Sequence, residues 1–326
     1  MKPWRLVKIV ALLGGLLLTA ALVARLGPHT ISAELADAGP RSLWLLAAYA
    51  AGTTLGALPW HVLLPDAVRP SVTASILSRF AASAANSVLP FAVTGEPVRL
   101  LWLRPEARAI GFAAIIVDRL AYAVASALFL FAGAIAAVRL AVLPADYAIA
   151  AAAVGVALFA GAGLVIWFAV RHRISVRIER LLGRLRKRAV PEAGFGDAID
   201  RALADLVRHR RRLVIAVGIS LLARIVLGLE VYAGFRVVGV TLSVDEALAF
   251  AAVPVFLSVA GAVVPNQLGI QEGSQAVIAS ALGIPAASAV AVVLLQRIRQ
   301  VVTALFALVV VATVRRGQRP IEIASR

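Results

Sequence analysis

Charged side chains stand inside apolar stretches of this chain, where they cost free energy unless something holds them. Asp118 and Arg119 lie near the start of one long apolar run, and Arg297 and Arg299 lie well inside another. An ionisable group at the centre of a membrane helix costs at least about 2.5–3.5 kcal/mol, so it is interpreted as functional by default. Arginine binds phosphate through two parallel hydrogen bonds and does not lose its charge. These positions are therefore candidates for holding an anionic group.

Two apolar segments, 86–97 and 265–273, are interrupted by proline, asparagine, glycine and a carboxylate, one in each half of the chain. In lipid, an unwound backbone survives only where protein buries it or where it lines a wet cavity. Paired interruptions in the two halves of a membrane protein indicate a transport site. Together with the charged positions, the candidate substrate-binding or transport residues are Asn86, Glu96, Arg99, Asp118, Arg119, Asn266, Gln271, Glu272, Arg297 and Arg299.

Each acid has more than one interpretation. Glu96 could bind a cation or pair with Arg99 in a hairpin, or it could cap the next helix, since a helix N-terminus favours an anion. Asp118 and Arg119 are neighbours, and neighbouring helical side chains point about 100° apart, so we expect each to reach a different partner. Arg119 could hold a phosphate, pair with Glu96, or join two helices in a structural ion pair.

The second half offers similar alternatives. Arg297 and Arg299 could contact a lipid phosphate, and either could pair with Glu272. Gly269 and its neighbours allow the backbone to turn or to approach a ligand closely. Arg224 and Glu230 lie six positions apart in another apolar run, so they do not lie on one face of a helix. We expect each to join its helix to a neighbouring helix.

Composition places the chain in membranes. Of 326 residues, 61% are hydrophobic and the mean hydropathy is +0.92, whereas soluble domains are about 45–50% apolar. We predict an all-α, polytopic inner-membrane protein with about six to eight spans, because each span needs about 20 apolar residues. Continuous apolar runs predict spans at about 6–26, 42–64, 110–138, 146–170, 213–238 and 286–314. With no cysteine, no clustered histidines and no nucleophile–base set, we expect no metal, no cofactor and no catalytic residue.

Loop charge predicts orientation. The loop 171–212 carries thirteen Lys or Arg against five Asp or Glu, half of the total net charge of +16. By the positive-inside rule this loop and both termini should be cytoplasmic. We therefore predict one transmembrane domain over 1–314, with halves 1–170 and 213–314 and a basic tail at 315–326. Its exposed cations suit anionic lipid head groups rather than nucleic acid.

Counting crossings sharpens the topology. The loop 171–212 and the N-terminus share a side only if 72–94 dips into the membrane and returns, which predicts a re-entrant or broken hairpin. The segment 246–283 is a second hairpin, either re-entrant or crossing twice. Glu96 precedes Arg119 by 23 positions and Glu272 precedes Arg297 by 25. The spacing favours two halves that form an inverted repeat.

Several short motifs resemble the flippase-like family, also called the lysylphosphatidylglycerol synthase transmembrane region. They are Gly95-Glu-Pro-Val-Arg99, Asp118-Arg-Leu120, Pro265-Asn-Gln-Leu-Gly-Ile-Gln-Glu-Gly273 and Gln296-Arg297, and the set is most similar to the hopanoid-biosynthesis-associated branch. The resemblance covers roughly 6–314. It implies a protein that moves lipids or polar lipid derivatives between leaflets. Only a short tail follows 314, so we expect no synthase activity.

Two functions remain open from the sequence. The first is a lipid transporter, in which arginines engage an anionic head group while acids hold a cation, couple to protons or neutralise the empty site. The second is a membrane subunit or scaffold of a lipid-modifying complex, which would bind a hopanoid or aminoacyl-lipid biosynthetic enzyme without transporting anything. The lipid, the direction of movement, a coupling ion and the oligomeric state are not encoded in any motif.

Overall fold

The structure is a computed structural model of the whole chain. It describes residues 38–88, 95–141, 194–260 and 269–317, with scattered positions over 24–36 and 153–177. The predicted spans 6–26 and, for the most part, 146–170 lie outside the described residues. So do the tips of both interrupted segments, 89–94 and 261–268, and with them Asn266.

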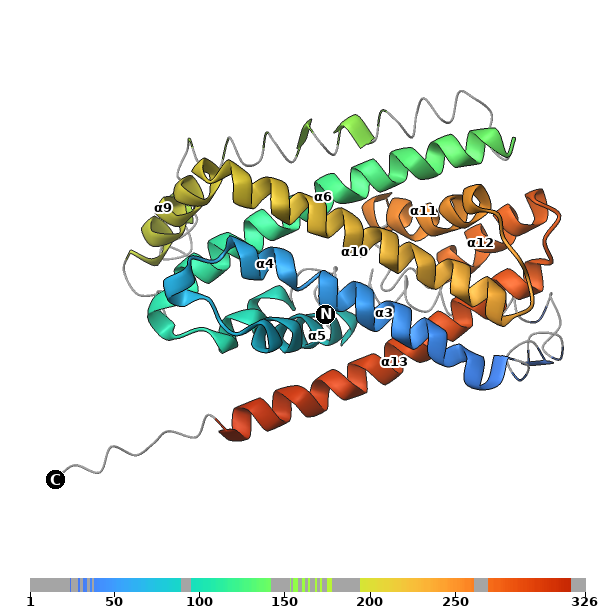
Figure 1. The fold of residues 1–326 in the computed structure, drawn as a ribbon, viewed down its shortest axis with the longest axis horizontal. Helices are drawn as coiled ribbons and strands as arrows, with labels where there is room; N and C mark the ends of the chain where they lie inside the picture. Colours follow the sequence, from blue (N-terminus) through green and yellow to red (C-terminus); the bar gives the residue numbers. More distant parts are fainter. Residues whose placement is uncertain are drawn as a thin grey trace, which may run out of the picture.

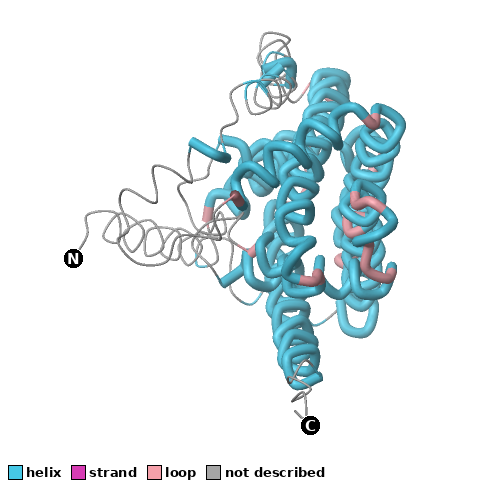
Figure 2. Tube along the Cα trace, turned by 90° about the vertical axis from the view of Figure 1, so that its left-hand side faces the viewer, coloured by secondary structure: helices cyan, strands magenta, loops and turns pink. Residues whose placement is uncertain are grey.

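Within these described ranges, every regular element is a helix (Figures 1 and 2). In chain order the elements are η1 (Gly39–Ser42), α3 (Leu43–Leu55), α4 (Leu58–Leu63), η2 (Asp66–Val68), α5 (Val72–Val88), η3 (Glu96–Trp102), η4 (Pro105–Ala107), α6 (Arg108–Arg139), α9 (Phe195–Arg208), α10 (Arg210–Val237), α11 (Val244–Ala260), α12 (Ile270–Ala281) and α13 (Ala286–Gly317). The all-α prediction is confirmed.

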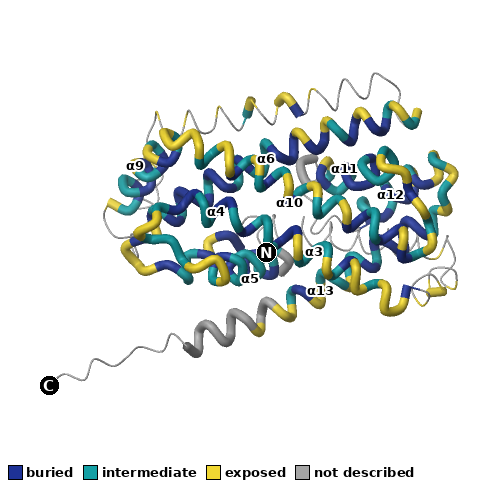
Figure 3. The backbone as a smooth tube through the Cα atoms, viewed as in Figure 1, coloured by how far each residue is buried: buried dark blue, intermediate teal, exposed yellow. Residues whose placement is uncertain are grey.

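In the part of the chain that the structure describes, three helical stretches are long and apolar enough to cross a membrane: Pro105–Arg139, Arg210–Val237 and Ala286–Phe306. Their outward faces carry large apolar side chains, such as Leu229, Val301 and Phe306, which are more than half exposed. Figure 3 shows exposed positions recurring along α10 and α13, while buried positions gather where helices face one another. Such apolar surface is expected for helices that meet lipid.

The first interrupted segment reverses direction after α5. η3 packs against α5, and the returning chain passes so close that a Cβ on Gly95 would meet the Ala82 carbonyl and lie 2.7 Å from the Asn86 nitrogen. Asn86 fixes this approach, because its Oδ1 accepts a hydrogen bond from the Gly95 N–H at 2.8 Å. Only glycine lets the two backbones approach this closely.

The second predicted hairpin, 246–283, corresponds to α11 and α12, helices of 17 and 12 residues that pack against each other. At 1.5 Å per residue they span about 26 and 18 Å, less than the roughly 30 Å of a hydrocarbon core. Pro254 inside α11 has no N–H for the carbonyl of Phe250, four residues earlier. Gln275 of α12 supplies the missing donor, with Nε2 at 3.0 Å from that carbonyl. The side chain therefore ties the two arms together.

Each half of the chain packs against the long helix of the other half. The first arm of each hairpin packs against the long helix of the other half, α5 on α13 and α11 on α6. Phe80 meets Phe306 edge-to-face across the first contact, with ring centroids 6.2 Å apart. Both first arms have 17 residues, both long helices have 32, and α6 and α13 run in opposite directions (Figure 1). The contacts between the two halves are thus reciprocal, and the inverted repeat stays a prediction.

Three segments that are far apart in the sequence lie at one end of the bundle. The start of α6, the helix α9 from the basic loop, and the C-terminal end of α13 all lie at the left in Figure 1. Helix α9 is amphipathic and buries Ile199, Leu203 and Leu206 in a cluster that includes residues of α6. The described part of the basic loop thus lies at the same end of the molecule as the start of α6 and the end of α13.

Candidate functional site

A buried ion network joins α5, η3 and α6. Glu96 accepts from three arginines: Arg79 at 3.0 Å, Arg99 at 3.2 Å and Arg119 at 3.2 Å. Asp118 is the second acid, bonded to Arg99 Nη1 at 2.7 Å and to Arg119 Nη2 at 3.1 Å. We call these five residues the first charge cluster; it has three cations and two anions.

Packing shields the first charge cluster from its surroundings. Glu96, Arg99 and Asp118 are at most 2% exposed. The Arg99 guanidinium lies over Trp60, 4.5 Å from the ring centroid, and the Trp60 indole N–H donates to the Gly111 carbonyl at 3.2 Å. Cation–π contact favours a desolvated guanidinium. The cluster is therefore a closed structural element in this conformation.

A second group of ion pairs joins α10, α12 and α13. Arg297 Nε lies 3.2 Å from Glu272 Oε1, and Arg299 Nη2 lies 2.8 Å from Glu230 Oε1. The other Glu272 oxygen accepts the Gly269 N–H at 2.8 Å, so this acid also caps the start of α12. These four residues are the second charge cluster.

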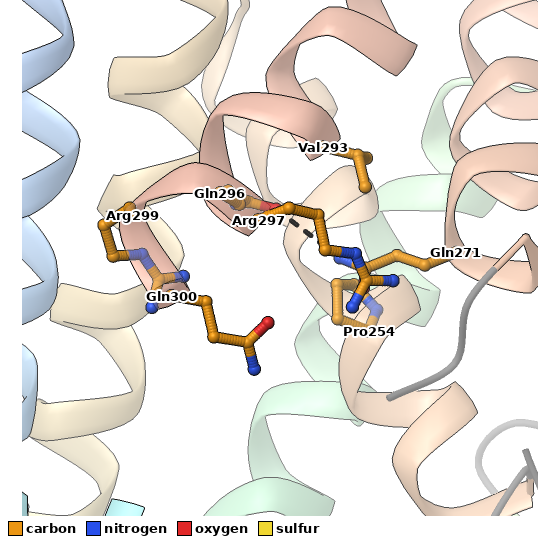
Figure 4. A pocket seen from close by; sticks show the side chains of 7 residues that line it. All are labelled: Pro254, Gln271, Val293, Gln296, Arg297, Arg299 and Gln300. Atoms are coloured by element: carbon orange, nitrogen blue, oxygen red, sulfur yellow. Dashed lines mark hydrogen bonds between the residues drawn. The ribbon is translucent and has the colours of Figure 1, made fainter. Parts of the chain in front are cut away.

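Beside the second charge cluster are two adjoining cavities of about 210 and 190 Å³, which share Pro254, Gln271, Gln296 and Arg299 in their walls. Figure 4 shows Gln271 hydrogen-bonded to Gln296, with Arg297 and Arg299 on either side of Gln300. We call the two together the central cavity.

The central cavity is polar and net positive. Its charged lining residues are Arg224, Arg297 and Arg299 against one acid, Glu230, which leaves a net charge of +2. Glutamine side chains add neutral donors and acceptors. A phosphate group is an anion of suitable size with acceptor oxygens for guanidinium groups.

A model of the lysylphosphatidylglycerol synthase transmembrane region matches residues 7–308, nearly the whole chain. The chain belongs to this family. The family is a membrane domain of lipid-related proteins, which agrees with the apolar outer surface and the charged interior. No curated protein and no solved structure matches the chain.

One aromatic ring lies between the first charge cluster and the central cavity. Arg119 of the first charge cluster lies over Tyr122 at 5.1 Å, and Arg224 of the central cavity lies over the same tyrosine at 4.3 Å. Arg224 also donates to Ser126 Oγ at 2.9 and 3.2 Å. Tyr122 thus lies between a cation of the first charge cluster and a cation that lines the central cavity.

Most of the candidate residues predicted from the sequence come together as expected. Glu96 pairs with Arg99 and Arg119, and Arg297 pairs with Glu272. The expectation for Asp118 and Arg119 is wrong in part. They bond to each other as well as to other partners, because Asp118 reaches Arg99 and Arg119 reaches Glu96, two side chains of η3 that are themselves paired.

Sequence analysis missed three residues of the site, Arg79, Tyr49 and Gln275, and it did not place Arg224 and Glu230 in the cavity. Arg79 is a cation within an apolar segment, so intramembrane charge was a usable signal. Glu230 was noted only as a residue joining helices, yet it lines the cavity together with Arg224. Tyr49, whose ring lies 3.8 Å from the Arg299 guanidinium carbon, and Gln275 carried no local signal. Among the described residues no group of three His, Cys, Asp or Glu is placed to hold a metal.

Proposed function

We propose that this protein transports a lipid with an anionic or polar head group between the leaflets of the inner membrane. The central cavity is the observation that supports this proposal most directly. It presents three arginines to a space large enough for a phosphate group and part of a head group, among helices whose outer faces suit lipid.

The depth of the arginines supports a transport path. Arg224 stands 14 residues after the start of α10, about 21 Å along the axis, and Arg299 stands 13 residues after the start of α13, about 20 Å. Both positions lie well inside a hydrocarbon core of about 30 Å. A cationic site near the midplane lowers the barrier for a charged head group while its tails stay in the bilayer.

The broken hairpins supply the movable parts in this proposal. α5 with η3 enters from the end that bears α9, and α11 with α12 enters from the opposite end (Figure 1). We propose that both are re-entrant, that both termini are cytoplasmic, and that the hairpins alternate in opening the central cavity. Rocking of inverted halves around a fixed site is a common basis of alternating access.

We further propose that the protein performs no chemistry on the lipid. A hopanoid-type lipid derivative, the substrate class suggested by the motif resemblance, is one possible cargo, and anionic phospholipids are another. A lipid-biosynthetic enzyme would then act on the same lipid before or after its movement.

The transport proposal is tested by reconstitution into liposomes with fluorescent phosphatidylglycerol, followed by dithionite quenching of the outer leaflet. We expect the wild type to expose inner-leaflet lipid within minutes, and Arg297→Ala and Glu272→Gln to reduce that rate at least tenfold. Glu106→Gln is the matched control, because this acid is exposed outside both clusters. If no labelled lipid moves and the protein instead co-purifies with a lipid-modifying enzyme, it is a scaffold.

The orientation has a separate test in a chain without native cysteine. A cysteine introduced at Arg104, beside the start of α6, should react with an impermeant maleimide only from the cytoplasmic side. Labelling from outside alone would contradict the first re-entrant hairpin.

A further inference from the structure

Glu230 differs from the other buried acids in how it is neutralised. Glu96 contacts three arginines, Asp118 contacts two, and Glu272 has both Arg297 and a backbone N–H. Among the described residues, Arg299 is the one cation bonded to Glu230, which is only 4% exposed. The charge of this acid therefore depends on a single guanidinium.

That guanidinium faces the central cavity and keeps donor capacity. Arg299 lines both parts of the cavity, and its Nε is buried without a hydrogen-bond partner among the described residues. The Tyr49 ring holds the group in place at 3.8 Å. A phosphate in the cavity would bind Arg299 at the position that Glu230 now occupies.

Among the described residues, no other charged group contacts Glu230, and Arg297, which also lines the cavity from α13, pairs with Glu272 instead. α13 contributes Arg299 and α3 contributes Tyr49, while α10 itself contributes Arg224, which is bonded to Ser126 and lies over Tyr122. The parts of α6, α11 and α12 that line this space do so with residues that do not titrate, such as Phe129, Pro254 and Gln271.

A displaced Glu230 would be an ionised carboxylate without a cation in a buried site. Leaving one charge of a buried pair uncompensated is strongly unfavourable, and a group in that situation takes up a proton instead. The proton comes from water and adds to one carboxylate oxygen, giving a neutral acid. No bond other than that O–H forms or breaks.

We infer that the cavity binds the phosphate of an anionic lipid together with one proton, which Glu230 accepts when the phosphate replaces it on Arg299. This inference rests on the proposed transport function and gives it a driving force. One negative charge and one proton enter together, so transport of a singly charged lipid is electroneutral and follows a pH gradient from the acidic to the alkaline side.

Calorimetric titration of the purified protein in a non-ionic detergent with dihexanoyl-phosphatidylglycerol tests this at equilibrium. Titrations at pH 8 in buffers of different ionisation enthalpy count the protons taken up. We expect about one proton per lipid bound, and an affinity that weakens about tenfold per pH unit above neutrality. Binding without proton uptake would overturn the inference and leave the transport proposal standing.

Glu230→Gln distinguishes coupling from a structural role. The variant has no competing carboxylate, so we expect it to bind the lipid at least tenfold more tightly than the wild type at pH 8, with no proton uptake and no pH dependence. A merely structural Glu230 would give weaker binding or unchanged proton uptake. Glu106→Gln should behave as the wild type in both measurements.

Transport measurements in liposomes distinguish proton-coupled transport from uncoupled transport and from no transport. With coupling, a pH gradient across the liposome should drive net accumulation of labelled phosphatidylglycerol in the leaflet on the alkaline side for the wild type, and equal distribution for Glu230→Gln. If the wild type moves no lipid and binds none, the transport proposal itself fails.

Discussion

The two charge clusters use the same residue types for different purposes. In the first, three arginines and two acids bond to one another, and Trp60 covers the most deeply buried cation. In the second, each acid has one arginine, and the cations face a cavity. Residue type alone does not separate a structural network from a binding site. What separates them is whether the cations retain donor groups that face open space.

The reciprocal packing of the halves gives this difference a physical context. Each hairpin packs against the long helix of the other half. The ion pairs of the first charge cluster therefore also hold the elements against which the second half packs. The first charge cluster is rigid, whereas each acid of the second charge cluster has one arginine. Ions with one partner can exchange it for a ligand in the cavity. The comparison leads to four predictions, from the largest expected effect to the smallest.

Replacing Glu96 by Gln should destabilise the fold most. The change leaves three arginines with one acid in a buried site, and breaking a buried pair costs about 3–5 kcal/mol. Thermal unfolding in detergent measures this. Adding Arg79→Met removes the cation that contacts Glu96 alone within the cluster, so the double variant should recover part of the loss. A loss below about 1 kcal/mol would mean that the first charge cluster is not structural.

Arg299→Gln should act mainly on binding, because Glu230, left without its arginine, takes up a proton and does not remain a buried charge. Hydrogen bonds to charged groups contribute about 1.5–3 kcal/mol, so dihexanoyl-phosphatidylglycerol should bind roughly ten- to a hundredfold more weakly. Arg201→Gln is the control, since Arg201 pairs with Asp197 on the exposed side of α9. Equal loss in both variants would indicate general electrostatic attraction instead of a site.

Gly95→Ala tests the first hairpin. The new methyl group would meet backbone atoms of α5, which cannot move aside as a flexible side chain can, so we expect a loss of about 1–3 kcal/mol in unfolding free energy. Gly218 in α10 has open space around the same position, and Gly218→Ala should instead stabilise by up to about 1 kcal/mol. Similar melting temperatures for both variants would contradict the tight approach of η3 to α5.

Tyr49→Phe should have the smallest effect. The hydroxyl group lies 2.8 Å from Ser83 Oγ, and its loss should lower the unfolding free energy by about 0.5–1.5 kcal/mol. The aromatic ring that contacts Arg299 remains, so lipid affinity should stay within about twofold of the wild type. A larger loss of affinity would assign the hydroxyl group a role in binding.

Much of the helical arrangement was predictable from local sequence. The spans expected at 110–138, 213–238 and 286–314 correspond to α6, α10 and α13 within a few residues, because continuous apolar runs in lipid leave helix as the economical backbone structure. The span expected at 42–64 is instead divided into α3 and α4 near Gly56 and Pro59. The pairing of Glu272 with Arg297 also followed from intramembrane charge.

Partners from distant elements were less predictable. Glu230 and Arg299 are 69 positions apart in the chain, and Tyr49 comes from a third helix. No periodicity or motif links them, because a helix pattern gives the face of a residue but not the neighbour opposite it. The Pro254–Phe250–Gln275 arrangement was hidden for the same reason, since the orphaned carbonyl and its donor lie on different helices.

By itself, the sequence determined that this chain is a helical membrane protein with charges that must be neutralised inside it. Hydrophobicity and the cost of burying charge act locally, so they can be assessed from residue type and spacing. Only the tertiary structure decided which cations are buried in a network with several acids and which face a cavity. That outcome depends on how helices from both halves pack, because each ion finds its partner across a helix interface rather than along its own chain.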